Sequence, residues 1–146
     1  MAVISIIVPC YNVEKYIDRC FKSLKRQTIG VEQMEIIFVD DASTDHTWDK
    51  LCEIEKLYPD NVILVHCEEN GRQGKARNIG MTYATSDYVG FVDSDDWVEP
   101  DMYEIMLGEM IKNDRDIVYC KFFRDSGEGI KEHRLDGTVA NLLIDT

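Results

Sequence analysis

The sequence has no long hydrophobic run and comparatively few cations. Its longest apolar stretch, near Val3 to Val8, is far shorter than the roughly 20 residues that a transmembrane helix needs. No basic segment with a small-residue cleavage site precedes this stretch, so we expect no signal peptide. The 16 lysines and arginines are outnumbered by 28 aspartates and glutamates, which gives a net charge of −12. Such an acidic surface argues against broad binding to the phosphate backbone of nucleic acids.

Paired cysteines and metal-binding clusters of histidine are also missing. The five cysteines are odd in number and include no C-x-x-C motif. Most of them lie within apolar patterns, so we expect reduced thiols in the core of a cytosolic protein. The three histidines have no ligand spacing with these cysteines, and we therefore expect no zinc site.

What the sequence does have is a regular alternation of strand and helix patterns, over a length of 146 residues that suits one domain. Strands are predicted at residues 4–8, 36–39, 62–65, 88–92 and 117–123, with another short one near 130–135. Helices are predicted from the cap Asn12 to about Gln27, from residues 43–45 to just before Pro59, and over 74–84 and 100–113. We therefore expect an α/β fold in three layers, with helices on both faces of a mostly parallel sheet.

The rest of the chain is organised around the segment Tyr88–Trp97. An apolar strand, predicted to be central and buried on both faces, runs directly into Asp93, Asp95 and Asp96. Hard oxygens at Asp93 and Asp95 can converge on one Mg²⁺ or Mn²⁺, which would offset the repulsion among the carboxylates. Because Mg²⁺ is usually held by one or two carboxylates plus substrate phosphates, a phosphorylated ligand is implied. The alternative is an acidic turn that caps the next helix.

Two earlier strand ends also carry candidate binding residues. Pro9 and Tyr11 follow the first strand, where a rigid turn can offer backbone amides and an aromatic face to a nucleobase; the alternative is a turn and a helix cap. Asp40 and Asp41 follow the second strand, where a carboxylate can accept the N3–H of uracil. The Ser, Thr and Asp that come next favour a helix cap, but the acid pair exceeds what capping needs.

A cationic segment precedes and enters the third predicted helix. It combines glycines with Arg72, Lys75 and Arg77. Cations are unfavourable at this end of the helix dipole unless a diphosphate binds there; the alternative is a surface loop with solvated cations. Because the carboxyl ends of parallel strands share one edge of a sheet, the four segments predict a common site. A nucleotide with a diphosphate and a divalent ion would suit that site.

In these motifs the chain resembles the inverting glycosyltransferases of family 2, which have the GT-A fold and use nucleotide-diphosphate sugars. The matching stretches are residues 4–12, 36–45, 74–80 and 88–97, in the order and spacing of the family. The resemblance implies that Pro9 and Tyr11 line the base site. It also implies that Asp41, with Asp40, pairs with uracil.

The same resemblance assigns the remaining polar residues of the site. It implies that Arg72, Lys75 and Arg77 lie near the diphosphate. It also implies that Asp93 lies near the ribose and the metal, and that Asp95 binds the metal, either Mn²⁺ or Mg²⁺.

The resemblance further implies metal-dependent sugar transfer, with inversion, from a UDP-sugar to a hydroxyl of a carbohydrate or lipid-linked acceptor. On this resemblance we expect the activity to belong to polysaccharide or cell-surface glycan synthesis. We expect it in the cytoplasm, at the inner face of the plasma membrane, with peripheral membrane association of the full-length protein. A catalytically incomplete nucleotide-binding fragment, or a non-enzymatic nucleotide-binding module, is the alternative.

The boundaries expected from the resemblance leave the acceptor side incomplete. Residues 1–124 are expected to form the donor-binding core, and residues 125–146 the start of the acceptor-side region. The family places its catalytic Asp or Glu well downstream of the D-x-D motif, so the base is expected beyond Thr146. Glu128, Glu132 and Asp136 lie too early in the chain to take that role.

Overall fold

A computed structural model of the chain describes residues 2–121, 123–125 and 130–132. Two compact units are present, Met1–Ile105 and Met106–Thr146. The elements, in chain order, are β1 (Ile4–Cys10), α1 (Ile17–Lys25), the 3₁₀ turn η1 (Val31–Gln33), β2 (Met34–Asp40), α2 (Thr47–Leu57), β3 (Val62–His66), α3 (Arg72–Tyr83), β4 (Tyr88–Phe91), α4 (Met102–Asn113), β5 (Phe123–Asp125) and β6 (Ile130–Glu132).

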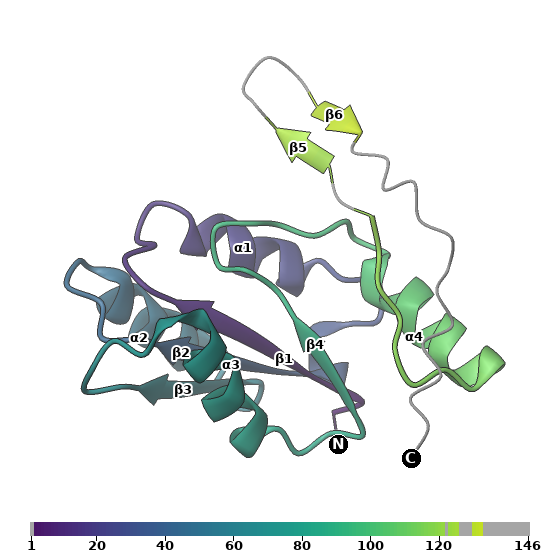
Figure 1. The fold of residues 1–146 in the computed structure, drawn as a ribbon, viewed down its shortest axis with the longest axis horizontal. Coiled ribbons are helices and arrows are strands. Elements are labelled where there is room, and N and C mark those ends of the chain that lie inside the picture. The colour runs from purple at the N-terminus through teal and green to yellow at the C-terminus, as the bar shows by residue number, and fades with distance from the viewer. Residues whose placement is uncertain (1, 122, 126–129, 133–146) are drawn as a thin grey trace. The chain divides into compact units, whose positions relative to one another are not determined.

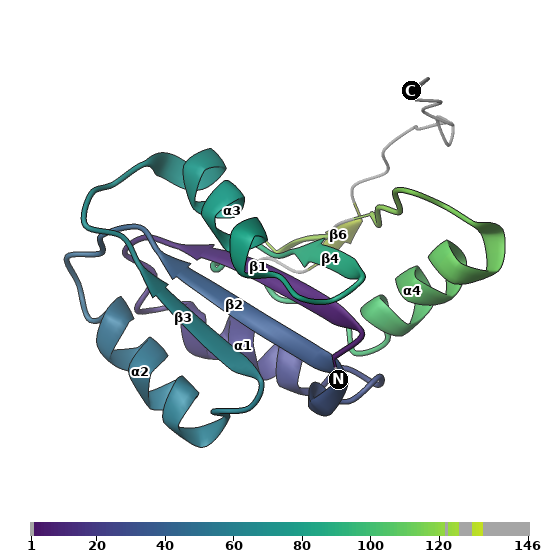
Figure 2. The ribbon, with the colours of Figure 1, turned by 90° about the horizontal axis from the view of Figure 1, so that it is seen from below.

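The first unit is built on a four-stranded sheet with the order β3-β2-β1-β4. All of its strand pairs are parallel, so the carboxyl ends of the strands lie at one edge. Helices α1 and α2 cover one face of the sheet and α3 covers the other (Figures 1 and 2). The three-layer α/β fold with a mostly parallel sheet is therefore confirmed.

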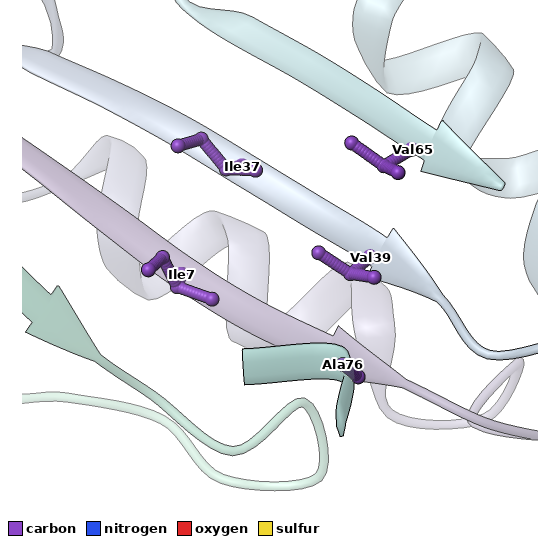
Figure 3. Close-up of a cluster of buried hydrophobic side chains, with 5 residues drawn as sticks. All are labelled: Ile7, Ile37, Val39, Val65 and Ala76. Carbon is purple, nitrogen blue, oxygen red and sulfur yellow. The ribbon is translucent and has the colours of Figure 1, made fainter. Parts of the chain in front are cut away.

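The core lies on both faces of the two central strands, because β1 and β2 consist almost entirely of apolar residues. Alternate side chains of a strand point to opposite faces. On the α3 side, Ile7, Ile37, Val39 and Val65 gather against Ala76 (Figure 3). A strand buried on both faces needs this continuous apolar character, whereas the helices need only one apolar stripe.

Helix α3 packs closely against the sheet because its inward face is small. The sequence pattern predicts that the buried face of this helix consists of Ala76, Ile79, Gly80 and Tyr83. Ala76 and Gly80 are indeed buried. Ile79 is partly buried against the same cluster. The prediction that Tyr83 points inward was wrong, since its side chain is 46% exposed. Tyr83 is the last residue of the helix, and it does not belong to the residues that pack against the core cluster.

The prediction that the strand before the D-x-D motif is central and buried on both faces was also wrong. In the part of the chain that the structure describes, β4 is an edge strand that pairs only with β1. Its residues alternate between half-buried and exposed, and Val89 and Phe91 are exposed. A β-branched and aromatic run alone cannot distinguish an edge strand from a central one.

Asn12 does not cap the first helix, which begins five residues later, at Ile17. Asn12 has a positive φ of 50° and bonds the loop that follows β2, as described below. The cap predicted for α2 at residues 43–45 was wrong, because the N-cap is His46 and makes no side-chain cap hydrogen bond. The Asp45 carboxylate nevertheless accepts the Thr47 N–H at 2.9 Å, at the first residue of the helix.

In the second unit the expected strand at 117–123 was wrong for residues 117–121, which form no strand. Ile117 and Tyr119 are 65% and 58% exposed, so this alternating pattern finds no apolar surface to cover. A short antiparallel pair of β5 and β6 follows instead. The strand expected near 130–135 is confirmed over residues 130–132, and residues 133–135 lie outside the described part.

All five cysteines are free thiols. Only Cys10 and Cys20 are buried, and Cys120 is exposed, so a core position holds for two of them. Within the described residues, none of the helices is both long and apolar enough to pass through a bilayer.

Candidate functional site

A cavity of about 380 Å³ opens at the carboxyl edge of the sheet. Residues from four separated segments line it: Pro9, Cys10, Tyr11, Val13, Asp41, Asn70, Arg72, Gln73, Ala76, Ser94 and Asp95. These segments follow β1, β2, β3 and β4, which is the convergence that a parallel sheet imposes on its strand ends.

Five of the candidate residues predicted from the sequence line the cavity. Pro9, Tyr11, Asp41, Arg72 and Asp95 line its wall. The other four candidates, Asp40, Lys75, Arg77 and Asp93, are not part of the lining.

Asn12 and the loop after β2 fix the position of Tyr11. The Asn12 side-chain oxygen accepts the backbone N–H groups of Thr44 and Asp45, at 2.8 and 3.3 Å. In return, the Asn12 N–H donates to the Ser43 hydroxyl at 3.0 Å. The two strand-end loops are therefore cross-linked next to the cavity, and the exposed ring of Tyr11 projects from a fixed backbone.

Asp41 ties the β2 end to the loop that precedes α3. One of its carboxylate oxygens accepts the Gly71 N–H at 2.8 Å, and its carbonyl accepts the Asn70 amide at 3.3 Å. Its own N–H donates to the Cys10 carbonyl at 2.8 Å. Asp41 is only 3% exposed, so its carboxylate is a pre-oriented acceptor in the cavity wall.

Asp40 lies elsewhere and does not reach the cavity. Its side chain is fully buried and accepts from His66 Nδ1 at 2.8 Å and from the Ser43 N–H at 3.4 Å. Its second oxygen, Oδ1, has no hydrogen-bond partner among the described residues. The His66 ring in turn packs on the Trp48 ring, with 4.7 Å between centroids. The Asp40 side chain thus bonds the loop after β2 on the side that faces away from the cavity, because adjacent residues at a strand end point to opposite sides.

Arg77 and Asp93 form an ion pair that joins α3 to the D-x-D loop. Arg77 Nη2 donates to Asp93 Oδ1 at 2.6 Å, and both side chains are about two-fifths exposed. The Lys75 side chain, by contrast, lies over Gly71. A Cβ atom added at Gly71 would clash with this side chain. The three cations of the segment therefore have three different environments, and only Arg72 lines the cavity.

The D-x-D loop gathers three carboxylates, and among them Asp93 alone has an ion-pair partner within the described residues. Burial, together with the charges of Asp95 and Asp93, raises the pKa of the Asp96 carboxyl against the opposing effect of Arg19. Burial and the same three carboxylates raise the pKa of the Cys20 thiol to about 12. A cation near Asp95 would relieve this repulsion.

A divalent metal fits this donor set. The described residues contain no cluster of three or more Asp, Glu, His or Cys side chains that could hold a metal. Mg²⁺, however, commonly takes only one or two protein carboxylates and completes its shell with phosphates and water. Asp95, which lines the cavity, and Asp93, of which one oxygen is paired with Arg77, supply the hard oxygens required.

Several lining residues were not identified from the sequence. Val13, Gln73 and Ser94 belong to the wall, but their types carry no chemical signal. Ser94 is 5% exposed, and in the sequence it is only a small residue between two carboxylates. His66 was also missed as the partner of Asp40, although it is the last residue of the strand that pairs with β2.

Comparison with known proteins gives the family. The model of the family described as Glycosyl transferase family 2 matches residues 5–144. An uncharacterized glycosyltransferase, EpsJ of Bacillus subtilis, is 40% identical over 125 residues, which are 86% of this chain and 35% of EpsJ. The poly(ribitol-phosphate) beta-glucosyltransferase of Bacillus spizizenii is 36% identical over 98% of this chain and 23% of its own length.

Solved structures agree with this result. TarS 1–349 of S. aureus in complex with UDP superposes with a TM-score of 0.69 at 34% identity, over 77% of this chain and 32% of that one. The mannosyltransferase PcManGT of Pyrobaculum calidifontis, in complex with GDP-Man and Mn²⁺, has a TM-score of 0.61 at 28% identity, over 65% and 28% of the two chains. The chain spans about a third or less of the length of these relatives. The family match and the shared fold together show that this chain belongs to glycosyl transferase family 2 and has the GT-A fold.

Proposed function

We propose that this chain is the donor-binding part of an enzyme that transfers a sugar, with inversion, from a UDP-sugar to an acceptor hydroxyl. The observation that carries this proposal is the cavity itself. An aromatic side chain, a buried carboxylate, a cation and an exposed carboxylate from four strand ends line one space of about 380 Å³. The complex of TarS with UDP supports the choice of nucleotide.

In this proposal the uracil base of UDP lies between Pro9 and Tyr11, and the Asp41 carboxylate accepts the N3–H of the uracil. The Gly71 N–H and the Cys10 carbonyl hold Asp41 in place before the ligand arrives. Such preorganisation lowers the entropic cost of binding. Asp40 acts only through the backbone of the loop, since it is fully buried behind the cavity.

The diphosphate lies against the start of α3. Arg72 lines the cavity there, at the start of the helix, where the helix dipole favours an anion. Arg77 acts by orienting Asp93 through their ion pair. Lys75 lies one turn along the helix, over Gly71, and contributes long-range positive charge.

Asp93 and Asp95 would hold Mn²⁺ or Mg²⁺, which would supply charge neutralisation for the departing diphosphate. The Mn²⁺ complex of PcManGT supports a divalent metal in this fold. A carboxylate outside residues 1–146 would deprotonate the acceptor hydroxyl. The chain alone is then expected to bind the donor without transferring its sugar to an acceptor.

The acceptor belongs, in this proposal, to a bacterial polysaccharide or cell-surface glycan, assembled at the cytoplasmic face of the membrane. The support is the similarity to the poly(ribitol-phosphate) beta-glucosyltransferase of Bacillus spizizenii, whose name gives a polymer, poly(ribitol-phosphate). The acceptor-side region begins near residue 125 in this view, after a donor core of residues 1–124.

Isothermal titration with UDP, with and without Mn²⁺, tests the proposal. Asp41→Asn keeps one side-chain oxygen to accept the Gly71 N–H but replaces the oxygen proposed to accept the uracil N3–H by an NH₂ group. UDP affinity should therefore fall about tenfold or more. Asp95→Asn should remove most of the Mn²⁺ dependence. Asp60→Asn, at an exposed position before β3, is the matched control and should leave both unchanged. UDP binding that is absent, or equal with and without the metal, would reject the site.

A further inference from the structure

A second hollow, of about 340 Å³, lies beside the D-x-D loop and has a different charge. It is lined by Arg19, Lys22, Ser23, Arg26, Trp97, Val98, Glu99 and Pro100. We call this hollow the cationic pocket. It is formed entirely within the first unit.

The charge of the cationic pocket is opposite to that of the chain. Its lining holds three cations and one carboxylate, Glu99, which gives 3 − 1 = +2, whereas the whole chain carries −12. Arg19, Lys22 and Arg26 are three and four residues apart, so they lie on one face of α1 and its end, where like charges repel. Within the described residues, none of the three forms a salt bridge with a carboxylate.

The helix dipole accounts for only part of this arrangement. Lys22 lies in the last turn of α1, and a cation there is favourable. Lys25 gains the same benefit in the same turn, but it does not line the pocket and lies over the Tyr58 ring instead. The helix dipole therefore explains why basic residues occur at this end of α1. It does not explain why three of them line one hollow together with Trp97.

The walls of the cationic pocket are fixed without a ligand. The Arg19 guanidinium lies 3.8 Å from the Trp97 ring centroid, and the Val98 N–H donates to the Ser23 hydroxyl at 3.1 Å. Gln27, which is 4% exposed, donates to the Glu99 carbonyl at 2.6 Å. The loop over residues 97–99 is thus attached to α1, which preorganises the hollow for a rigid anion.

The cationic pocket and the donor cavity share one loop. Asp95 lines the donor cavity and Trp97 lines the cationic pocket, two residues later. Arg19 connects the two, because its Nη2 donates to the Asp95 carbonyl at 3.5 Å while its guanidinium stacks on Trp97. The cationic pocket therefore adjoins the part of the donor cavity that Asp95 lines.

We propose that the cationic pocket binds a phosphate group of the acceptor, so that the acceptor is a phosphate-bearing chain and not a neutral glycan. The assignment to the acceptor rests on the proposed function. The paired N–H donors of arginine match both phosphate and carboxylate, and the added lysine ammonium favours phosphate, which carries more negative charge.

The test is an NMR titration of ¹⁵N-labelled protein with glycerol 3-phosphate, with glycerol as the neutral counterpart and NaCl to match ionic strength. The chain has two tryptophans, so two indole N–H signals report on the pocket residue Trp97 and on the distant Trp48. Trp48→Phe assigns them. The Trp97 signal should shift saturably with glycerol 3-phosphate and stay unmoved with glycerol or NaCl.

Lys22→Glu and Lys25→Glu form a matched pair, since both reverse one charge in the last turn of α1. Lys22→Glu should raise the half-saturating concentration about fivefold or more, whereas Lys25→Glu should change it less than twofold. Equal effects of the two variants, or a Trp97 shift that NaCl reproduces, would overturn the pocket. UDP titration of Lys22→Glu separates this proposal from the preceding one, because the donor cavity should keep its affinity.

Vesicles of phosphatidylglycerol and of phosphatidylcholine distinguish a lipid from an acceptor. Suppose that the protein binds the anionic vesicles, that Lys22→Glu abolishes this binding, and that glycerol 3-phosphate does not shift the Trp97 signal. This result would overturn the acceptor assignment in favour of a membrane surface. A Trp97 shift with the soluble phosphate, and equal weak binding to both kinds of vesicle, would support it.

Discussion

Two glycines of α3 allow a sharp test of how this helix is placed on the sheet. A Cβ atom at Gly80 would lie 2.5 Å from Ile7 Cγ2 and 3.3 Å from Val39 Cγ2. A Cβ atom at Gly74 would meet no atom of the described residues within 4 Å. Gly80→Ala therefore forces α3 away from the sheet, whereas Gly74→Ala changes only the helix propensity.

The magnitudes follow from these distances. Replacing Gly by Ala inside a helix gains about 0.5–1 kcal/mol. Overpacking a dense core costs about 1–3 kcal/mol, and Gly80 falls toward the upper end because Ile7 is fully buried and β-branched. Gly80→Ala should thus destabilise the fold by about 1–2 kcal/mol, and Gly74→Ala should stabilise it by up to about 1 kcal/mol.

Urea unfolding, followed by far-UV circular dichroism, measures the difference. With a slope of about 2 kcal/mol per M, the midpoints of the two variants should be separated by about 1 M urea, with the wild type between them. A Gly80→Ala midpoint at or above that of the wild type would show that α3 does not lie this close to β1 and β2.

Three further outcomes are expected in the same assay. His66→Ala should cost about 2 kcal/mol, because the fully buried Asp40 carboxylate loses its closest donor, and an unchanged midpoint would contradict the pairing. Asn12→Ala should cost about 1–2 kcal/mol through two orphaned N–H groups, whereas Asn12→Asp should keep most of the stability. Burial acts to raise the pKa of Glu35, but hydrogen bonds from Ser5 and Thr85 outweigh it and lower that pKa below 4.5. The stabilisation by this carboxylate is therefore present above pH 4.5 and is lost as the pH falls through the lower folded pKa. Glu35→Gln should lower the free energy of unfolding at pH 7, and that free energy should then fall less steeply as the pH is lowered.

Much of the site could be predicted because it depends on local rules. Apolar runs ending in polar residues mark the carboxyl ends of parallel strands, and such ends converge whatever the details of packing. Five candidates, Pro9, Tyr11, Asp41, Arg72 and Asp95, accordingly meet in one cavity. Residues without reactive groups, such as Val13 and Gln73, could not be identified because only their position makes them part of the wall.

Neighbouring candidates separated in ways that no pattern indicated. Asp40 and Asp41 look equivalent in the sequence, yet one is buried against His66 and the other faces the cavity. The two-residue period of a strand requires opposite directions, but which of the two faces the ligand depends on the helices that cover each face.

By itself, the sequence determined the alternation of strands and helices, the parallel sheet and the edge at which the polar residues gather. These properties follow from side-chain periodicity and turn chemistry within a few residues. The tertiary structure alone decided that β4 lies at the sheet edge in the described part, that Asn12 bonds a loop more than 30 residues away, and that α1 and Trp97 enclose a cationic pocket. Such contacts join residues far apart in the chain, and their free energy depends on which surfaces the whole fold brings together.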